Sequence, residues 1–404
     1  MDFKLSSEHE MVRKMVADFA AKEVAPTIAE WDRKQEMAPD ILPKMAEQGL
    51  LGICVPVKYG GQGMDYISLG IASEELEYVD TSLRVVLSVH TGLCCLTLLQ
   101  WGTDEQKKEF LPPIASGELI GGGAFSEPNA GSDFAAIRMT ARRDGDDFIL
   151  NGEKMWISLS TKADMAIVTT RSQLDKEKEH EGLTTFLVDL HSKGVTTGDI
   201  HGKLGVRAGS TGWIAMQDVR VPARNMIGEE GEGFKITMSA FDNGRYTVAA
   251  GATGLVHASL DASVAYAKER ETFGRPIMAH QLVQAKIAKM HLDYEIARLL
   301  YLKAGWMKNE GLRNTLETSR AKQFATYASY EAATEAVQIH GGYGFSDEYP
   351  VERFLRNSKG AVIYEGSNEI QTLIQAGYAL GSRRDKPLRC ELPAYDEETW
   401  LAEA

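Results

Sequence analysis

Cysteine is scarce in this chain, and the few cysteines present follow no recognisable pattern. Only four occur among 404 residues, at Cys54, Cys94, Cys95 and Cys390, with no Cys-x-x-Cys pair and no zinc-ligand spacing of cysteine and histidine. This pattern disfavours a disulfide framework and indicates reduced thiols in a reducing compartment. We therefore expect a cytoplasmic protein.

The chain also lacks a basic run. Lys and Arg number 44 against 57 Asp and Glu, which gives a formal net charge of −13 at pH 7. Such a surface is repelled by nucleic acid, which carries one negative charge per ~1.7 Å of duplex, and by anionic membranes. We expect no membrane span, because no apolar stretch approaches the ~18 residues that cross a bilayer. Residues 1–8 resemble neither a signal peptide nor a transit peptide, so we expect no targeting segment.

Several common catalytic and nucleotide-binding motifs are missing. The sequence contains no GxGxxG, no GKS or GKT, no HExxH and no GxSxG. A nicotinamide fold, a P-loop, a zinc hydrolase and a serine hydrolase are therefore not indicated. The nine histidines are scattered, and those on helix faces, such as His257 and His291, are expected to be packed or solvated. We expect no metal site.

What the sequence does contain is a change of hydrophobic period along its length. Apolar residues recur at helical spacing up to residue 119, with a capping box expected at Ser7 and Glu10. Short strands follow over 120–232, including a hairpin expected at the Asn151–Gly152 turn. Helical spacing returns over 233–382, and we assign no fold to the tail, 383–404. We therefore expect an α+β protein with an N-terminal α-helical domain, a middle β-domain and a C-terminal helical bundle. The bundle seam is expected at Val283, Ile287, Met290, Tyr294, Ala297 and Tyr301.

Two segments carry candidate chemistry. Residues 121–133 are rich in glycine and predict a loop whose backbone amides can approach a flat or anionic ligand, although a plain surface connection is the alternative. In 361–371, Glu365 ends an apolar run. An apolar setting raises a carboxyl pKa toward neutrality and suits it to remove a weakly acidic C–H proton. The alternative is a turn residue before a helix that Ser367 or Asn368 caps.

Six separated segments together resemble the acyl-CoA dehydrogenase family. They are SEPNAGSD at 126–133, KMWIS at 154–158, FDNGR at 241–245, ERETFGRP at 269–276, QIHGGYG at 338–344 and IYEGSNEIQ at 363–371. Each segment alone is weak, but six in the family's order are specific. The resemblance implies an α-domain, a β-domain and a four-helix bundle, the order that the hydrophobic period also predicts.

The resemblance implies FAD as cofactor, an acyl-CoA as substrate and electron-transferring flavoprotein as electron acceptor, in a homotetramer. Glu365 matches the catalytic base, which takes the α-proton of the thioester while the β-hydride leaves to the flavin. The residues that match flavin contacts are Phe125, Ser126, Trp156 and Ser158 at the ring, then Arg270, Phe273, Gln281, Gln338 and Gly342 across a subunit interface, with Ser367 and Gln371 near the base. The residues that match substrate contacts are Ser132, Asp242 and Arg245 along coenzyme A, with Tyr364 and Gly366 beside the base.

The acyl group is suggested by Glu77, Asp80 and Arg84, which are expected on one helix. Spacing alone favours a surface ion pair between Asp80 and Arg84. Glutaryl-CoA dehydrogenases, however, carry Arg at the position that Arg84 matches and Glu seven residues earlier, as here. A buried Arg needs an anionic partner, and we expect a distal carboxylate of the substrate, in glutaryl-CoA or a substituted succinyl-CoA such as benzylsuccinyl-CoA.

Other functions stay open on the sequence. One is oxidation of a short or branched monocarboxylic acyl-CoA. Another is a non-catalytic protein that binds flavin and acyl-CoA, and a third is an oxidase that passes electrons to oxygen.

Overall fold

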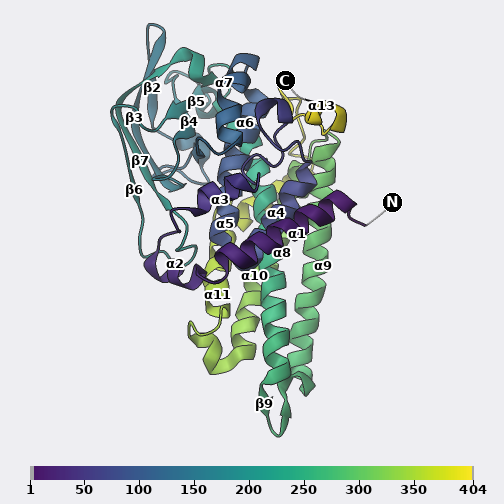
Figure 1. Ribbon diagram of the computed structural model, residues 1–404. Helices are drawn as coiled ribbons and strands as arrows, with labels where there is room; N and C mark the ends of the chain where they lie inside the picture. Colours follow the sequence, from purple (N-terminus) through teal and green to yellow (C-terminus); the bar gives the residue numbers. More distant parts are fainter. Residues whose placement is uncertain (1–3, 403–404) are drawn as a thin grey trace.

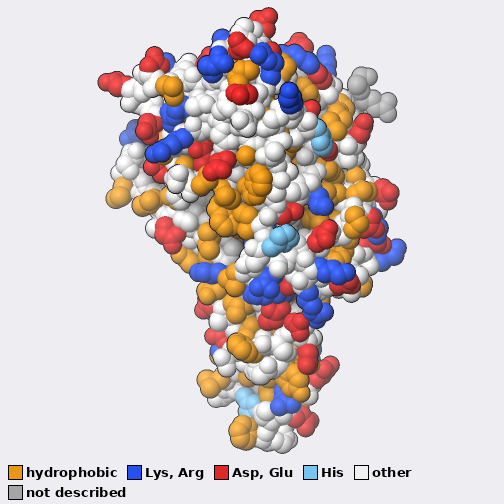
Figure 2. Space-filling model, turned by 90° about the vertical axis from the view of Figure 1, so that its left-hand side faces the viewer, with side chains coloured by type: hydrophobic (Ala, Val, Ile, Leu, Met, Phe, Trp, Pro, Cys, Tyr) orange, Lys and Arg blue, Asp and Glu red, His pale blue; other side chains and the backbone are white. Residues whose placement is uncertain are grey.

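The computed structural model describes residues 4–402, which form a helical region, a β-sheet and a helical bundle in chain order (Figure 1). The α+β organisation is as predicted. The space-filling view (Figure 2) shows a broad upper part that narrows to the end of the bundle, with apolar side chains gathered across the middle of this face.

The N-terminal region is built of helices that surround an apolar run. They are α1 (Ser7–Phe19), α2 (Ile28–Lys34), α3 (Ile41–Glu47), α4 (Tyr66–Val79), α5 (Thr81–Val86), α6 (Leu96–Trp101) and α7 (Asp104–Ala115), with π-helical turns at Ala20–Val24 and Leu87–Cys95. The predicted capping box is wrong by one residue. Ser6 caps α1 by accepting from the backbone N–H of His9, and the His9 side chain completes the box.

The helix expected to carry Glu77, Asp80 and Arg84 together is broken. At Asp80 the backbone is extended, with φ −162° and ψ 139°, so α4 ends at Val79. The Asp80 carboxylate then caps α5 by accepting from the N–H of Ser82 at 2.8 Å. This capping bond stabilises the break, and Glu77 and Arg84 therefore approach from two different helices.

The expectation that no apolar stretch reaches membrane-spanning length is wrong. The helical run Thr81–Trp101 is 21 residues long with a mean hydropathy of 1.6, which is enough by length and composition alone. All of its most apolar window is buried inside the protein. Here it packs against α8 (Gly233–Glu269) and the first strand of the sheet, so it forms the middle of the core.

An eight-stranded sheet follows, in the order β6-β7-β3-β2-β4-β5-β8, with β1 paired to β4. The strands are β1 (Gly121–Ala124), β2 (Thr140–Asp144), β3 (Asp147–Ser158), β4 (Met165–Arg171), β5 (Leu183–Asp189), β6 (Val195–Asp199), β7 (Thr211–Pro222) and β8 (Met226–Ile227). The predicted Asn151–Gly152 hairpin is wrong. β3 runs through this pair, and its pairing with β7 shifts register between Leu150 and Gly152. The extra residue at this shift lies on β7, which advances three positions from Val219 to Met216 while β3 advances two, so Asn-Gly stays in a strand opposite a bulge.

The glycine-rich segment is only partly a loop. Gly121–Ala124 form a buried strand that pairs with β4 in parallel. A Cβ at Gly121 would lie 2.7 Å from Sγ of Cys94, so glycine lets this strand approach the apolar run. The loop proper begins at Phe125.

Long helices form the C-terminal bundle. They are α8, α9 (Gln281–Asn309), α10 (Thr315–His340), α11 (Val351–Ala361) and α12 (Asn368–Ala379), with short strands β9 (Glu271–Thr272) and β10 (Arg275–Pro276) at the lower end in Figure 1. The predicted seam on α9 is correct, because Met290, Ala297 and Tyr301 are buried. Helix α11 was not predicted from the sequence.

The tail left without a predicted fold is packed against the body. It ends in α13 (Glu397–Leu401), and Trp400 is buried. Its ring lies 5.4 Å from that of Tyr66 and 5.3 Å from that of Tyr395.

Candidate functional site

Glu365 lies in the short connection between α11 and α12, in a strained backbone conformation. Its φ is 52° and that of Gly366 is 85°, and a left-handed conformation is unfavourable for a residue with a Cβ. The side chain points at α8, where a Cβ on Gly244 would overlap Oε2. That oxygen is buried and has no hydrogen-bond partner among the described residues. Burial raises the pKa of Glu365 above its ordinary value.

Arg84 is fully buried beside this carboxylate, and each nitrogen of its guanidinium has a partner. Nε donates to Oε2 of Glu77 at 2.5 Å, Nη1 to Oγ of Ser88 at 2.9 Å and Nη2 to the Tyr364 hydroxyl at 2.6 Å. Nη1 also lies 3.9 Å from Oε1 of Glu365. Although burial alone lowers the pKa of Arg84, the carboxylate of Glu77 outweighs it and holds this pKa above its ordinary value. The guanidinium therefore borders the same space as Glu365.

The surface pair between Asp80 and Arg84 that spacing favoured is not formed. Both side chains are buried. Asp80 instead accepts from Nε of Arg353 and Nδ2 of Asn357, each at 3.0 Å. The break after Val79 turns Asp80 toward α11 and leaves Glu77 as the anion next to Arg84.

Gly251 on α8 makes room for the buried pair. A Cβ at this position would overlap Oε2 of Glu77 and lie 2.7 Å from Cγ of Arg84. One turn earlier on α8, Thr247 shares a 2.6 Å hydrogen bond with Ser88. The floor beneath Arg84 is thus made of polar groups that are all hydrogen-bonded.

Gly366 and the residues after it hold the connection in place. Ser367 caps α12 by accepting from the N–H of Ile370, as the alternative reading of this segment expected. Gln371 is fully buried, and its Nε2 donates to the carbonyl of Gly366 at 2.9 Å. This bond ties Gln371, which the resemblance places among the flavin contacts near the base, to the Glu365 connection.

The four residues expected at the flavin ring lie together in the β-domain. The N–H of Met155 donates to the carbonyl of Ser126 at 3.0 Å, which places β3, with Trp156 and Ser158, beside Phe125 and Ser126. Trp156 has φ 64° and a 63% exposed side chain. An indole held open in this way offers a flat apolar surface, which fits an isoalloxazine ring.

These four residues border the Glu365 region through Leu93. A Cβ on Gly123 would contact both Phe125 and Leu93, and a Cβ on Gly244 would contact both Leu93 and Glu365. Phe125 also packs edge-on against Phe241, with ring centroids 5.2 Å apart. The ring-binding surface and the carboxylate therefore both adjoin Leu93.

The five residues expected at the other end of the flavin lie elsewhere. Arg270, Phe273, Gln281, Gln338 and Gly342 are all exposed at one end of the bundle, where Tyr266 stacks on His340 with centroids 4.2 Å apart. Phe273 is 95% exposed, and among residues 4–402 Arg270 forms no ion pair. This end lies far from the sheet (Figure 1), so one chain does not bring the two sets together.

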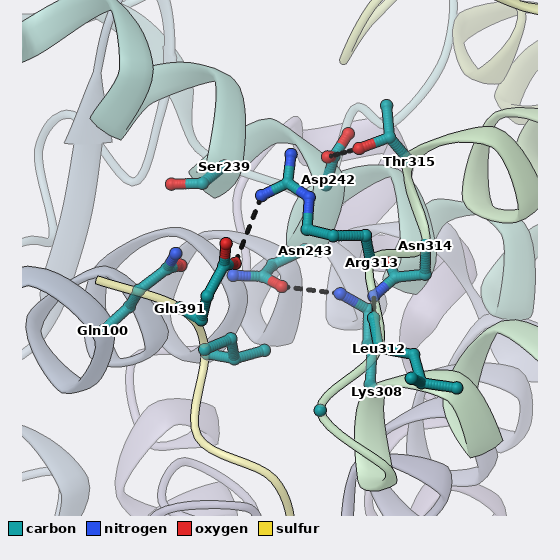
Figure 3. A pocket seen from close by; sticks show the side chains of 12 residues that line it. Gln100, Ser239, Asp242, Asn243, Lys308, Leu312, Arg313, Asn314, Thr315 and Glu391 are labelled. Atoms are coloured by element: carbon teal, nitrogen blue, oxygen red, sulfur yellow. Dashed lines mark hydrogen bonds and ion pairs between the residues drawn. The ribbon is translucent and has the colours of Figure 1, made fainter. Parts of the chain in front are cut away.

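A polar pocket opens on the Asp242 side of the site. Figure 3 shows Lys308 and Arg313 turned toward Asn243 and Glu391 across it. Asp242 accepts from Thr315 at 2.5 Å and pairs with Arg245 at 3.0 Å. Arg245 in turn reaches Gly366, since a Cβ there would lie 3.2 Å from its Nε. Asp242 thus connects the pocket to Glu365.

Ser132 lies near this path. It is exposed in the loop after β1, and the ring of Phe134 in that loop packs against Phe241, with centroids 5.7 Å apart. The loop is thereby held beside Asp242.

Sequence reasoning missed several residues of this site. Gly244 and Gly251 were not singled out, and neither were Ser88, Thr247 and Lys322. The seven-residue spacing of the two glycines on α8 was a signal for a close approach, but nothing local indicated what approaches. Within residues 4–402 there is no group of three or more His, Cys, Asp or Glu that could hold a metal ion.

Comparisons with known proteins match the whole architecture. Models of the acyl-CoA dehydrogenase N-terminal, middle and C-terminal domains match residues 6–118, 122–219 and 231–379. The short-chain specific acyl-CoA dehydrogenase of Clostridium acetobutylicum is 40% identical over 377 residues, which cover 93% of this chain and 99% of that protein.

Solved structures agree. A chain from a study of the electron transferring flavoprotein of Acidaminococcus fermentans is 40% identical, with a TM-score of 0.92 over 95% of this chain and 100% of that one. A glutaryl-coenzyme A dehydrogenase in complex with glutaryl-CoA is 37% identical, with a TM-score of 0.92 over 98% and 100%. A glutaryl-CoA dehydrogenase from Mycobacterium smegmatis, in complex with FADH2, is 31% identical, with a TM-score of 0.88 over 95% and 97%.

Proposed function

The chain belongs to the acyl-CoA dehydrogenase family, whose members depend on FAD, and we propose that its substrate is an acyl-CoA with a distal carboxylate. Glutaryl-CoA and substituted succinyl-CoA esters such as benzylsuccinyl-CoA are the compounds of this class. The observation that carries the proposal is the buried guanidinium of Arg84, whose Nη1 lies 3.9 Å from Oε1 of Glu365.

The partners of Arg84 support a carboxylate on one side of the guanidinium. Its Nε donates to the carboxylate of Glu77, whereas Nη1 and Nη2 donate to the neutral hydroxyls of Ser88 and Tyr364. Neutral hydroxyl partners can be exchanged for a carboxylate at a lower cost than an anionic partner can. A guanidinium also presents two parallel donors that suit a carboxylate.

Glu365 is the base in this proposal, and it removes the α-proton of the thioester. Its Oε2 has no partner and faces Gly244, so the oxygen is available to a substrate carbon. Among the described residues its backbone N–H donates to no acceptor, and it can stabilise the thioester oxygen as charge develops there. FAD, when bound, accepts the hydride that leaves the β-carbon.

The remaining assignments follow the family resemblance. Phe125, Ser126, Trp156 and Ser158 bind the flavin ring, and a second subunit supplies the exposed bundle end with Arg270 and Phe273. We propose a homotetramer on this ground, and the exposed apolar side chains support it.

Ser132, Asp242 and Arg245 line the coenzyme A path. Electrons pass to electron-transferring flavoprotein, and the location is the cytoplasm.

A second candidate substrate is a short-chain monocarboxylic acyl-CoA. The similarity to a short-chain specific enzyme favours it. So does Glu77, because Arg84 already has a buried anionic partner and does not need a substrate carboxylate for charge balance.

A substrate panel tests the proposal. The holoenzyme is mixed anaerobically with glutaryl-CoA, benzylsuccinyl-CoA and butyryl-CoA, and the loss of oxidised-flavin absorbance is followed. We expect at least one dicarboxylic ester to reduce the flavin faster than butyryl-CoA does. If only butyryl-CoA reduces it, the carboxylate proposal is wrong and the second candidate stands. Rapid oxygen consumption during turnover would instead indicate an oxidase.

A further inference from the structure

We propose that Lys322 on α10 is a positioning residue for Glu365, which holds the strained connection through the Gly366 carbonyl and supplies an unpaired positive charge beneath the carboxylate. This inference rests on the proposed role of Glu365 as the base. It does not depend on which acyl group is oxidised.

The contacts of Lys322 are all to the residues that follow Glu365. Its Nζ is buried and donates to the carbonyl of Gly366 at 2.9 Å and to Oδ1 of Asn368 at 3.0 Å. Thr326, one turn along α10, donates to the same Oδ1 at 3.0 Å. The first turn of α12 is therefore fixed to α10 through Lys322.

The backbone at Glu365 needs such support. Left-handed conformations of residues other than glycine persist where the surroundings over-determine them. Here the carbonyl oxygen of Gly366, directly after Glu365, accepts two hydrogen bonds of 2.9 Å, one from Nζ of Lys322 and one from Nε2 of Gln371. Two donors from two helices fix this peptide, so the carboxylate is held toward Gly244.

The charges around Glu365 come from four helices. Arg84 on α5, Lys322 on α10 and Arg245 on α8 lower its pKa, while burial and Glu77 on α4 raise it. Arg84 is paired with Glu77, and Arg245 with Asp242.

Lys322 differs from the two arginines because its hydrogen-bond partners are neutral. Among residues 4–402 its Nζ has no carboxylate partner within ion-pair distance, and Glu365 and Glu369 are the two carboxylates whose charges act on it. The groups that face it are Glu365, Arg245, Glu369 and Arg84, and burial is the main reason that its own pKa falls to about 7.

Two substitutions separate the hydrogen bond from the charge. Lys322→Met removes both, and Lys322→Gln keeps an N–H donor without the charge. Ser319→Ala is the matched control, because the hydroxyl of Ser319 bonds α10 to α12 through the carbonyl of Gln371 at 3.2 Å and does not touch Gly366. All are tested as holoenzymes, with FAD content and thermal midpoint measured first.

Proton removal is measured apart from hydride transfer. In 3-thiabutyryl-CoA and 3-thiaglutaryl-CoA a sulfur replaces the β-carbon, so the base can take the α-proton while no hydride can leave. The long-wavelength absorbance of the resulting anion beside the flavin reports this step against pH. We expect Lys322→Met to raise the apparent pKa of this step by about one unit, because a nearby cation favours the carboxylate. We also expect kcat to fall about tenfold or more with KM changed less than threefold.

The outcomes are distinct. Lys322→Gln is expected to raise the apparent pKa of proton removal as Lys322→Met does. Its loss of kcat at high pH should be smaller, because the N–H donor is kept. If Lys322→Met does not fold, Lys322→Gln alone provides the test. An unshifted pKa in both variants, or losses equal to those of Ser319→Ala, would overturn the inference. Glu365→Gln tests the proposed base separately from the role of Lys322. If Glu365→Gln still removes the α-proton, the assignment of Glu365 as the base is wrong. If Glu365→Gln does not remove the proton but both Lys322 variants behave as the parent enzyme does, only the inference about Lys322 is rejected.

Discussion

Nε of Arg84 lies 2.5 Å from Oε2 of Glu77, and neither side chain is exposed to solvent at all. The pair joins α5 to α4 across the break at Asp80. Removing one partner of a buried ion pair leaves the other charge uncompensated, which typically costs about 3–5 kcal/mol. The pair is therefore part of the fold as well as a wall of the site.

Arg84→Met is expected to destabilise the protein by about 3–5 kcal/mol, because Glu77 is left buried and unpaired. The double variant Arg84→Met/Glu77→Gln should recover much of this loss in denaturant unfolding. In the double variant, KM for glutaryl-CoA should rise at least tenfold more than KM for butyryl-CoA. Equal changes for both substrates would mean that Arg84 has only a structural role.

Gly251→Ala should displace the Arg84–Glu77 pair by steric overlap. The added Cβ overlaps Oε2 of Glu77 and crowds Arg84, and overpacking of this kind costs about 1–3 kcal/mol. We expect a lower thermal midpoint and a loss of preference for the dicarboxylic ester. Gly254→Ala is the control, because its Cβ overlaps the backbone carbonyl of Glu74. It should lower stability and leave the substrate preference intact. A preference altered equally in both variants would argue against a specific role for Gly251.

Glu365→Gln should stop flavin reduction and leave FAD bound. The amide is nearly isosteric but cannot accept the α-proton, and a general base contributes about 10²–10⁴-fold to rate. Stopped-flow reduction and the flavin spectrum check the two parts. Activity close to that of the parent enzyme would contradict the assignment, and a loss of FAD would leave a structural role as the explanation.

The pH profile of kcat/KM should show an acid limb above the ordinary carboxyl pKa of 4.5. Burial raises the pKa of Glu365 in the free enzyme, and only the ionised carboxylate can act as a base. The rate must therefore fall as pH falls through the raised pKa and be constant above it, until another group titrates. A limb at or below the ordinary value would mean that burial does not control this group.

Trp400→Ala should destabilise the protein by about 3–5 kcal/mol, the usual cost of truncating a buried aromatic residue. Its ring is 3% exposed and packs on Tyr66, which connects the tail to the first residue of α4. The adjacent Leu401 is 48% exposed, so Leu401→Ala serves as control and should change stability by less than about 0.5 kcal/mol. Similar effects of both changes would show that the tail is not packed as described.

Local sequence patterns predict elements whose cause is local. The seam on α9, the three-part order and the helix cap at Ser367 all arise from spacing within a few residues, and each agrees with the structure. The Asn151–Gly152 pair shows the limit. A dipeptide that suits a turn is instead held within a strand, opposite a bulge on β7, because β7 pairs alongside β3.

Six local motifs were enough to relate this chain to the acyl-CoA dehydrogenase family, and hydrophobic spacing was enough to predict its α, β, α order and a glutamate at the end of an apolar run. Which charges meet depends on the packing of the helices. Arg84 reaches Tyr364 across 280 residues, and Lys322 reaches Gly366 across 44. Spacing favoured Asp80 as the partner of Arg84, but a helix break gave that place to Glu77. The physical reason is that a buried charge must find its partner in three dimensions, and hydrophobic periodicity places a residue on a face without stating what that face contacts.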